Sequence, residues 1–555
     1  MNGLKKNDIV YLQISDLGTE GEGIGKTDGF PLFVKGAIPG DEIEAGVTKL
    51  KKNYGYARLV SIVKASQDRV AADCPVFGRC GGCRLMHMSY EAQLAYKEKK
   101  VLETLIRIGG FDRDELSDKK DDILGMDKPF RYRNKAVYPV ARGRDGHICA
   151  GFFAARTHEV IECDDCLIGA EENAGIIKRV LKWMEEYGVE PYDEMNRKGV
   201  IRHIFIRKAF ATGELQLCLI SATDIVPHLN KLLEKLGDIT SVWLNVNSEN
   251  TNVIFGRKTE LIGGRGYIED VLLDIKFRIS PLSFYQVNPA QTHKLYGAAL
   301  DYADLKGGEY VWDICCGIGT ITLAAADRLR RIGRGGKVLG LEIVPEAIEN
   351  AKENAELNGI DNVEFICAPA EEYLPERIKQ AGENPDIIIV DPPRAGLERP
   401  AIDAILKVMP MKIVYVSCDP ATLARDLRIF ADGGYSIKHF RACDMFAQTS
   451  HVETVALLSK LSEAKHHIEV KVDMDELDLT SAEAKATYKE IQDWVQEKYG
   501  FHVTNLNIAQ VKQIHGIIER ENYNKAKSAD SKQPGCPEEK VKAIEDAMRH
   551  FQMID

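Results

Sequence analysis

The chain has 555 residues, of which 45% are hydrophobic and 28% charged, a mixture that excludes a wholly disordered or collagenous chain. Its formal net charge of −11 argues against a polycation that coats nucleic acid indiscriminately. At roughly 150 residues per domain, this length predicts three to four domains. The first residues, MNGLKK, lead into a strand-like stretch rather than a signal-peptide core, and no apolar run approaches the ~18 residues of a membrane span. We therefore expect a cytoplasmic protein that does not bind membranes, and the sequence indicates no obligate protein partner.

Residues 1–64 contain short β-branched segments separated by glycine turns, which predict a small antiparallel barrel of the oligonucleotide-binding kind. Basic residues alternate with aromatic ones in residues 48–58 (TKLKKNYGYAR) and again in residues 128–135 (KPFRYRNK). This alternation suits phosphates and stacked bases, and a solvated strand face explains either stretch equally well. The expected barrel strands are Asp8–Ile14, Gly18–Gly25, Pro31–Val34, Asp41–Val47 and Tyr56–Ile62.

Thirteen cysteines in a chain without a secretory signal indicate metal binding or catalysis rather than disulfides. Cys74, Cys80 and Cys83 form the strongest metal signal, and Cys163 or Cys166 can supply a fourth thiolate. Four thiolates suit either tetrahedral zinc or an iron–sulfur cluster. The spacing differs from the Cys-x3-Cys-x2-Cys of radical enzymes, so the cluster does not indicate radical chemistry.

The remaining chain divides into three regions that differ in predicted secondary structure. Residues 65–280 predict a mixed α+β domain, with a helix over 90–108 and further helices near 170–188 and 224–236. Residues 281–462 alternate strands and helices, which is typical of a doubly wound α/β domain. Residues 463–555 predict a helical extension: a capping box at Thr480 and Glu483 before one helix, a second through Ile508 and Ile518, and a third from Pro537. The strands expected in the α/β domain are Tyr310–Ile314, Val338–Glu342, Ile387–Val390, Ile413–Val416 and Thr454–Leu458.

A glycine-rich loop follows the first of these strands. In DICCGIGT, Gly317 and Gly319 let the backbone turn tightly and approach a ligand, and Glu342 ends the next strand, where it can accept hydrogen bonds from ribose hydroxyls. The loop lacks the third glycine of the dinucleotide fingerprint and the lysine of a phosphate-binding loop. A nucleoside without a pyrophosphate, such as S-adenosylmethionine, fits it better. The loop therefore predicts polar methyl transfer.

Two further strands end in residues suited to catalysis. One stops at Asp391-Pro-Pro-Arg394, and the arginine argues against amino-group methylation, whose enzymes usually place an aromatic residue there. The next stops at Ser417-Cys418-Asp419, where helix-end dipoles and local charge can activate a thiolate. Glu453, just before the last strand, supplies a carboxylate that can act as a base.

Together these residues resemble the RNA uracil-5-methyltransferase family, most closely its branch that acts on 23S ribosomal RNA and carries an N-terminal TRAM domain. The resemblance covers about residues 5–460. It implies that a TRAM barrel precedes a Rossmann-like methyltransferase domain that forms a covalent Cys–C6 adduct, with Cys418 as nucleophile and Glu453 as base. Cys315 stands where the family usually has an aromatic residue. The motifs are GEGIGK, FVKGAIPGD, CPVFGRCGGC, FYQVN, DICCGIGT, DPPRAGLE, SCDPATLARDL and HVETVALL.

The resemblance also implies two cofactors. S-adenosylmethionine contacts would come from Gln286 of FYQVN, the residue at 315, Glu342 and Asp391. A [4Fe–4S] cluster would be held by Cys74, Cys80, Cys83 and Cys166, since the segment HEVIECDDCLI matches the family's segment whose last cysteine precedes Leu-Ile.

Three other functions compete with ribosomal-RNA methylation. A transfer-RNA uracil-5-methyltransferase would use the same chemistry, although shorter transfer-RNA-specific members often lack both barrel and cysteine cluster. A cytosine-5-methyltransferase of RNA generally needs a second cysteine, which DPPRAG lacks. A metal-stabilised RNA-binding protein with an inactive transferase domain is the third.

Overall fold

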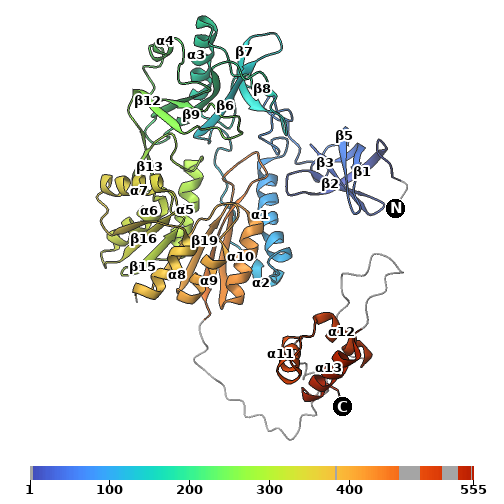
Figure 1. Cartoon of the computed structure of the whole chain (residues 1–555). Coiled ribbons are helices and arrows are strands. Elements are labelled where there is room, and N and C mark those ends of the chain that lie inside the picture. The colour runs from blue at the N-terminus through green and yellow to red at the C-terminus, as the bar shows by residue number, and fades with distance from the viewer. Residues whose placement is uncertain (1–3, 382–383, 462–487, 516–535, 552, 555) are drawn as a thin grey trace. The chain divides into compact units, whose positions relative to one another are not determined.

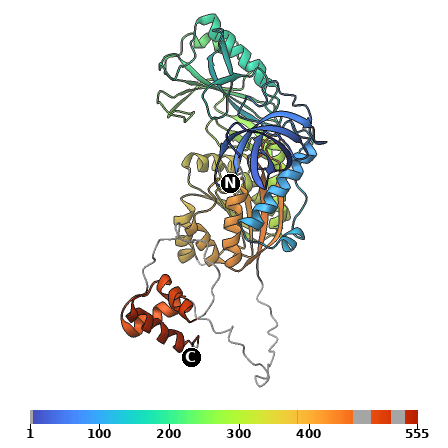
Figure 2. The ribbon, with the colours of Figure 1, turned by 90° about the vertical axis from the view of Figure 1, so that its right-hand side faces the viewer.

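The computed structural model describes residues 4–381, 384–461, 488–515, 536–551 and 553–554. The chain divides into two compact units, Met1–Ser462 and Glu463–Asp555. The first unit contains a barrel and two large sheets, and the second contains helices (Figures 1 and 2). Among the described residues, no helix is both long enough and apolar enough to cross a bilayer.

Five strands close a barrel at the start of the chain, in the order β1-β2-β3-β5-β4 (Figure 1). The expected antiparallel pairing is wrong at one point, because β3 and β5 are parallel. A closed ring with an odd number of strands cannot alternate direction at every step, so one parallel pair is unavoidable. The strands are β1 (Ile9–Leu17), β2 (Gly23–Thr27), β3 (Phe30–Lys35), β4 (Glu42–Leu50) and β5 (Gly55–Lys64).

A seven-stranded sheet occupies the middle of the chain, in the order β12-β11-β10-β9-β6-β7-β8, and only its β10–β11 pair is parallel. Helices α3 (Glu172–Tyr187) and α4 (Leu229–Leu233) correspond to the two predicted after residue 150, and they share one buried cluster with this sheet. A two-stranded hairpin follows it. The strands are β6 (Lys135–Arg142), β7 (Ile148–Phe153), β8 (Val160–Glu162), β9 (Ile201–Lys208), β10 (Leu215–Ser221), β11 (Ser241–Val246), β12 (Lys258–Gly264), β13 (Ile268–Leu272) and β14 (Ile275–Ile279).

The second large sheet has the order β17-β16-β15-β18-β19-β21-β20, in which β21 runs antiparallel to both its neighbours and the other pairs are parallel. Parallel strands buried on both faces read as continuous apolar runs, which is why their positions could be predicted. The strands are β15 (Tyr310–Ile314), β16 (Lys337–Glu342), β17 (Val363–Cys367), β18 (Ile387–Val390), β19 (Lys412–Ser417), β20 (Tyr435–Cys443) and β21 (Glu453–Lys460).

Helices cover both faces of this sheet, as the doubly wound prediction requires. Val311 of β15 belongs to one buried cluster with residues of α5, α6 and α7, whereas Trp312 belongs to a second cluster with residues of α8, α9 and α10. Helix α1 joins the second cluster through Val101 and Leu105, although it lies some 200 residues earlier in the chain. The helices are α1 (Tyr90–Arg107), α2 (Arg113–Ser117), α5 (Pro289–Ala303), α6 (Thr320–Ile332), α7 (Pro345–Leu357), α8 (Ala370–Ala381), α9 (Arg399–Val408) and α10 (Pro420–Asp432).

The second unit contains α11 (Tyr488–Tyr499), α12 (Asn505–Ile514) and α13 (Glu538–His550). Their apolar faces meet in one buried cluster, to which Ile491, Val511 and Ile544 belong. These are the three helices predicted for the extension. The capping box at Thr480 and Glu483 and the residue Ile518 lie outside the described residues.

Candidate functional site

The glycine-rich loop joins β15 to α6 in a conformation that its sequence makes possible. Gly317 and Gly319 have φ angles of 56° and 81°, and Cys315 has a φ of 68°. A Cβ on Gly319 would also lie 3.2 Å from the ring of Phe365 and 3.3 Å from Ala351. Left-handed backbone strongly favours glycine, so Cys315 is an exception of the kind that occurs at functional sites.

Glu342 ends β16 beside this loop. Its Oε2 accepts a hydrogen bond from the Gly317 amide at 3.0 Å, and its Oε1 accepts one from the Ile343 amide at 2.9 Å. The structure therefore brings the predicted ribose acceptor to the predicted glycine turn, at the carboxyl edge of the sheet where ligands bind in this fold.

A short hydrogen-bond chain connects two other predicted residues. The Tyr296 hydroxyl donates to Asp391 Oδ2 at 2.8 Å, and Gln286 Nε2 donates to the Tyr296 oxygen at 3.2 Å. Burial raises the pKa of Asp391 to about 6, while the Tyr296 hydrogen bond lowers it. Sequence analysis did not find Tyr296, because no motif marks a helix residue whose partners lie 10 and 95 positions away.

Cys418 follows β19 and Glu453 begins β21, so the antiparallel pairing of these strands brings both to the same edge. Burial, then the charges of Glu453 and Asp391, raise the pKa of the Cys418 thiol to about 11. Burial and Asp391 raise the pKa of Glu453 to about 8. The positive charge of Arg394 lowers both pKa values, so Arg394 supplies a cation at this site. From the sequence, Arg394 served only to argue against amino-group methylation.

The predicted metal-ligating cysteines line a cavity of about 330 Å³. Burial and the neighbouring Cys166, Cys80 and Cys74 raise the pKa of the Cys83 thiol to about 12. The cavity has room for more than a single ion, and an all-thiol donor set suits an iron–sulfur cluster. Cys163 also lines it, so both candidates for the fourth position are present.

The basic stretch at residues 128–135 lies partly at this cavity and only partly on an open face, where Lys128 is exposed. Tyr132 is buried and donates a hydrogen bond to the Ala447 carbonyl at 3.0 Å, while Arg133 and Lys135 line the cavity. The hypothesis that the aromatic residues of this stretch stack on bases is therefore wrong for Tyr132.

In the other basic stretch, residues 48–58 of the barrel, the aromatic side chains are exposed. Tyr54 and Tyr56 are exposed, and their rings lie 5.7 and 5.8 Å from the ring of Phe33. Exposed aromatic rings beside the lysines of residues 48–52 are a surface on which bases can stack.

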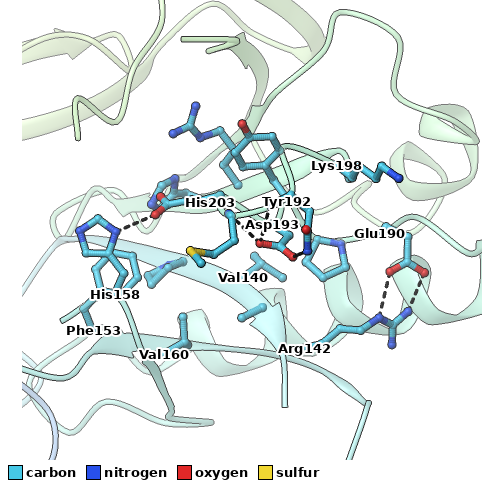
Figure 3. A pocket seen from close by; sticks show the side chains of 18 of the residues that line it. Val140, Arg142, Phe153, His158, Val160, Glu190, Tyr192, Asp193, Lys198 and His203 are labelled. Carbon is cyan, nitrogen blue, oxygen red and sulfur yellow. Dashed lines mark hydrogen bonds and ion pairs between the residues drawn. The ribbon is translucent and has the colours of Figure 1, made fainter. Parts of the chain in front are cut away.

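A separate cavity of about 1090 Å³ lies on the central sheet (Figure 3). Val140, Phe153, His158 and His203 are among the residues around it, and Arg142 pairs with Glu190 at its margin at 2.6 Å. None of the predicted site residues lines this cavity, so it is separate from the methyl-transfer site.

Comparison with known proteins agrees with this geometry. Residues 90–461 match the family described as tRNA (Uracil-5-)-methyltransferase, and residues 5–60 match the TRAM domain. The chain is 46% identical over 459 residues to an uncharacterized RNA methyltransferase of Halalkalibacterium halodurans, covering 82% of this chain and 98% of that protein. It is 44% identical over 466 residues to an uncharacterized RNA methyltransferase of Clostridium tetani, covering 83% and 98%.

The fold is also similar to a solved structure, the tRNA (uracil-54, C5)-methyltransferase of Pyrococcus abyssi in complex with S-adenosyl-L-homocysteine. The TM-score is 0.65 at 29% sequence identity, and the match covers 81% of this chain and 99% of the other. The predicted barrel, methyltransferase fold and use of S-adenosylmethionine on RNA are confirmed at this level. The chain therefore belongs to the RNA uracil-5-methyltransferase family, with an N-terminal TRAM domain.

Proposed function

We propose that the protein transfers a methyl group from S-adenosylmethionine to C5 of a uridine in 23S ribosomal RNA, giving 5-methyluridine. The observation that carries this proposal is the meeting of Cys418, Glu453 and Asp391 at one edge of the sheet, beside the glycine-rich loop. Uracil C5 is a weak nucleophile, so its methylation needs a thiolate at C6 and a base for the C5 proton. The target base must also leave its stack to reach such a site.

Each residue has a defined part in this reaction. The Cys418 thiolate adds to C6, which forms a C–S bond and moves an electron pair to C5. S-adenosylmethionine, when bound, would supply the electrophilic methyl group to C5 and leave as S-adenosylhomocysteine, whose sulfur keeps the electron pair of the broken S–CH3 bond. Glu453 then removes the C5 hydrogen as a proton, the C5–C6 double bond forms again, and the C–S bond breaks to return its electron pair to Cys418.

The electrostatics of the site support these roles for Glu453 and Cys418. A base works best when its pKa lies near the working pH, and the pKa of Glu453 is about 8. The Cys418 thiol, with a pKa of about 11, needs a cation or a bound ligand to favour its thiolate form. The positive charge of Arg394 lowers the pKa of the Cys418 thiol and so favours its thiolate form.

We assign the cofactor contacts to the loop and strand ends described above. Gly317 and Gly319 allow close approach of the ligand, and Glu342 accepts hydrogen bonds from ribose hydroxyls. Asp391 and Gln286 are the two ends of the hydrogen-bond chain through Tyr296. Cys315 contributes through its backbone conformation. We assign a [4Fe–4S] cluster to Cys74, Cys80, Cys83 and Cys166, where it would join the cysteine segment to the loop that follows β8.

The choice of ribosomal RNA is supported by the barrel and the cysteine segment against the shorter transfer-RNA-specific members of the family, which often lack both. Transfer RNA is the second candidate, because the P. abyssi enzyme is named for transfer RNA and its match covers 81% of this chain. The exposed rings of Tyr54 and Tyr56 suit single-stranded segments of either RNA.

A labelling experiment separates these substrates. Unmodified 23S fragments and transfer RNA are incubated separately with the protein and methyl-labelled S-adenosylmethionine, then digested for nucleoside mass spectrometry. Labelled 5-methyluridine in the ribosomal fragment is the expected result. Label only in transfer RNA would overturn the substrate and keep the chemistry, and labelled 5-methylcytidine would overturn the target base. Absence of label from both RNAs, with folded protein, would favour an RNA-binding module with an inactive transferase domain.

A further inference from the structure

The loop that joins β20 to Glu453 is buried along most of its length. A buried loop must satisfy its backbone polar groups inside the protein, because water does not reach them. Its shape therefore depends on side chains from other elements, and its last residue directly precedes Glu453. Its buried residues are Asp444, Met445, Ala447, Gln448, Thr449, Ser450 and Val452.

Gln93, a buried residue of α1, clamps this loop at Gln448. Its Oε1 accepts a hydrogen bond from the Gln448 amide at 3.0 Å, and its Nε2 donates to Gln448 Oε1 at 3.0 Å. The same Nε2 donates to the carbonyl oxygens of Leu85 at 3.1 Å and Met88 at 2.9 Å. Gln448 has a φ of 69°, a backbone conformation that disfavours any residue other than glycine, so these bonds hold a conformation that would otherwise relax.

The rest of the same helix face holds the loop on both sides of this clamp. Lys97 forms a buried ion pair with Asp444, and Lys100 Nζ donates to the Ser450 carbonyl at 2.9 Å. Residues 93, 97 and 100 are spaced four and three apart, so they share one face of α1. The helix thus holds the loop near its start, at its middle and near its end.

The cysteine segment holds the loop from another direction. The Gln448 carbonyl accepts hydrogen bonds from the amides of Arg84 at 2.8 Å and Leu85 at 2.9 Å, and Arg84 follows Cys83 in the chain. Ala447 packs in one hydrophobic cluster with Cys83 and Cys166. The wall of the cysteine cavity and the loop before Glu453 are therefore one packed unit.

Glu453 depends on this backbone for its position. Only burial and the charges of Asp391 and Arg394 act on its pKa, and within the described residues its carboxylate accepts no hydrogen bond. Strand pairing with Cys443 fixes one side of the residue. We propose that Gln93 is a positioning residue for the catalytic base: through Gln448 it sets the path by which the loop enters β21 at Glu453, and the cysteine segment supports the same point.

This inference rests on the proposed role of Glu453, and the chemistry offers a readout that a merely structural role would not change. If the base is misplaced, the methylated covalent adduct forms normally but breaks down slowly, since its breakdown needs the C5 proton removed. Gln93→Ala should lower kcat about 10- to 100-fold, the cost of a small misplacement of a reacting group, with the KM for S-adenosylmethionine changed less than about 2-fold. The fraction of enzyme trapped as denaturant-resistant RNA adduct should rise.

Gln216→Ala is the matched control. Gln216 is also a fully buried glutamine, and it bonds within the central part of the chain, to Ser241 and to the Ile279 carbonyl. Its replacement should leave the adduct fraction unchanged. Gln448→Gly provides a second variant, because glycine keeps the left-handed backbone and removes only the side-chain bond to Gln93. It should raise the adduct fraction as well.

The outcomes separate this inference from the proposed function. Glu453→Gln should trap adduct strongly, and if it does not, the role of Glu453 as base is wrong. If Glu453→Gln traps adduct while Gln93→Ala and Gln448→Gly, both folded, show a normal adduct fraction, the positioning role is wrong. If Gln93→Ala does not fold, Gln448→Gly alone decides the question. Replacement of Cys83 by serine should raise the adduct fraction too, which tests the support from the cysteine segment.

Discussion

The Tyr296 hydroxyl lies 2.8 Å from Asp391 Oδ2 and donates a hydrogen bond to it. Burial raises the pKa of the Asp391 carboxyl group to about 6, and among the described residues this hydrogen bond is the one interaction that lowers it. It links α5 to the end of β18, and through Gln286 to the segment before α5, so one phenol connects two of the residues to which we assign cofactor contacts.

Tyr296→Phe should therefore weaken binding of S-adenosylmethionine. Loss of a hydrogen bond to a buried charged group costs about 1.5 kcal/mol or more, which corresponds to roughly 10-fold in the dissociation constant. Isothermal titration calorimetry with S-adenosylhomocysteine measures the change. Tyr285→Phe is the matched control, since Tyr285 is equally buried and bonds to Asp270 instead. Equal affinity of Tyr296→Phe and the unmodified protein would contradict the assignment.

The rate at which the methylated adduct breaks down should rise with pH. Glu453 must be ionised to accept the C5 proton, and its pKa is about 8, so the ionised fraction increases from pH 6 to pH 9. Rapid-quench measurement on preformed adduct isolates this step from the formation of the Cys418 thiolate. A flat profile over this range would show that another group takes the proton.

The carboxyl group of Glu453 should also make the stability of the folded protein fall as the pH rises. Below about pH 4.5, Glu453 is protonated in both the folded and the unfolded chain, so burial opposes no charge. Its folded pKa of about 8 is raised, so its contribution to stability is lost as pH rises through the window from 4.5 to 8. Glu453→Gln should thus gain, relative to the unmodified protein, on the order of 4 kcal/mol of unfolding free energy between pH 4.5 and pH 9. Denaturant titrations at the two pH values measure it, and an equal difference at both would contradict this origin.

Removal of cluster ligands should change the spectrum of anaerobically purified protein. Cys83→Ser and Cys166→Ser should lose the brown colour and visible absorption of an iron–sulfur cluster. Cys218→Ser, at a buried cysteine that does not line the cavity, should retain them. Cys163→Ser decides the fourth ligand: retained absorption supports Cys166, and loss of absorption in Cys163→Ser but not in Cys166→Ser would reverse the assignment. Zinc without iron in the unmodified protein would contradict the cluster itself.

Much of the fold could be predicted because the relevant signals are local. The apolar runs at Tyr310–Ile314 and Ile387–Val390 have the observed strand boundaries, and acids or cysteines placed after such strands meet at one edge of a parallel sheet. The pairing of Gln93 with Gln448, 355 residues apart, leaves no local trace. The burial of Tyr132 could not be predicted either, since the alternating pattern around it is the same for an exposed strand and for a segment packed in a hydrophobic cluster.

The central claim is that Cys418 attacks C6 of a uridine whose C5 then receives the methyl group. An RNA in which the target uridine is replaced by 5-fluorouridine tests it most directly, because fluorine cannot leave as a proton and the adduct cannot break down. Incubation with S-adenosylmethionine, followed by protease and nuclease digestion and mass spectrometry, identifies the modified cysteine among the thirteen in the chain. The account predicts methylated fluorouridine on the peptide that contains Cys418, and no adduct in Cys418→Ala, which should still bind RNA. An adduct on another cysteine, or turnover by Cys418→Ala, would contradict it.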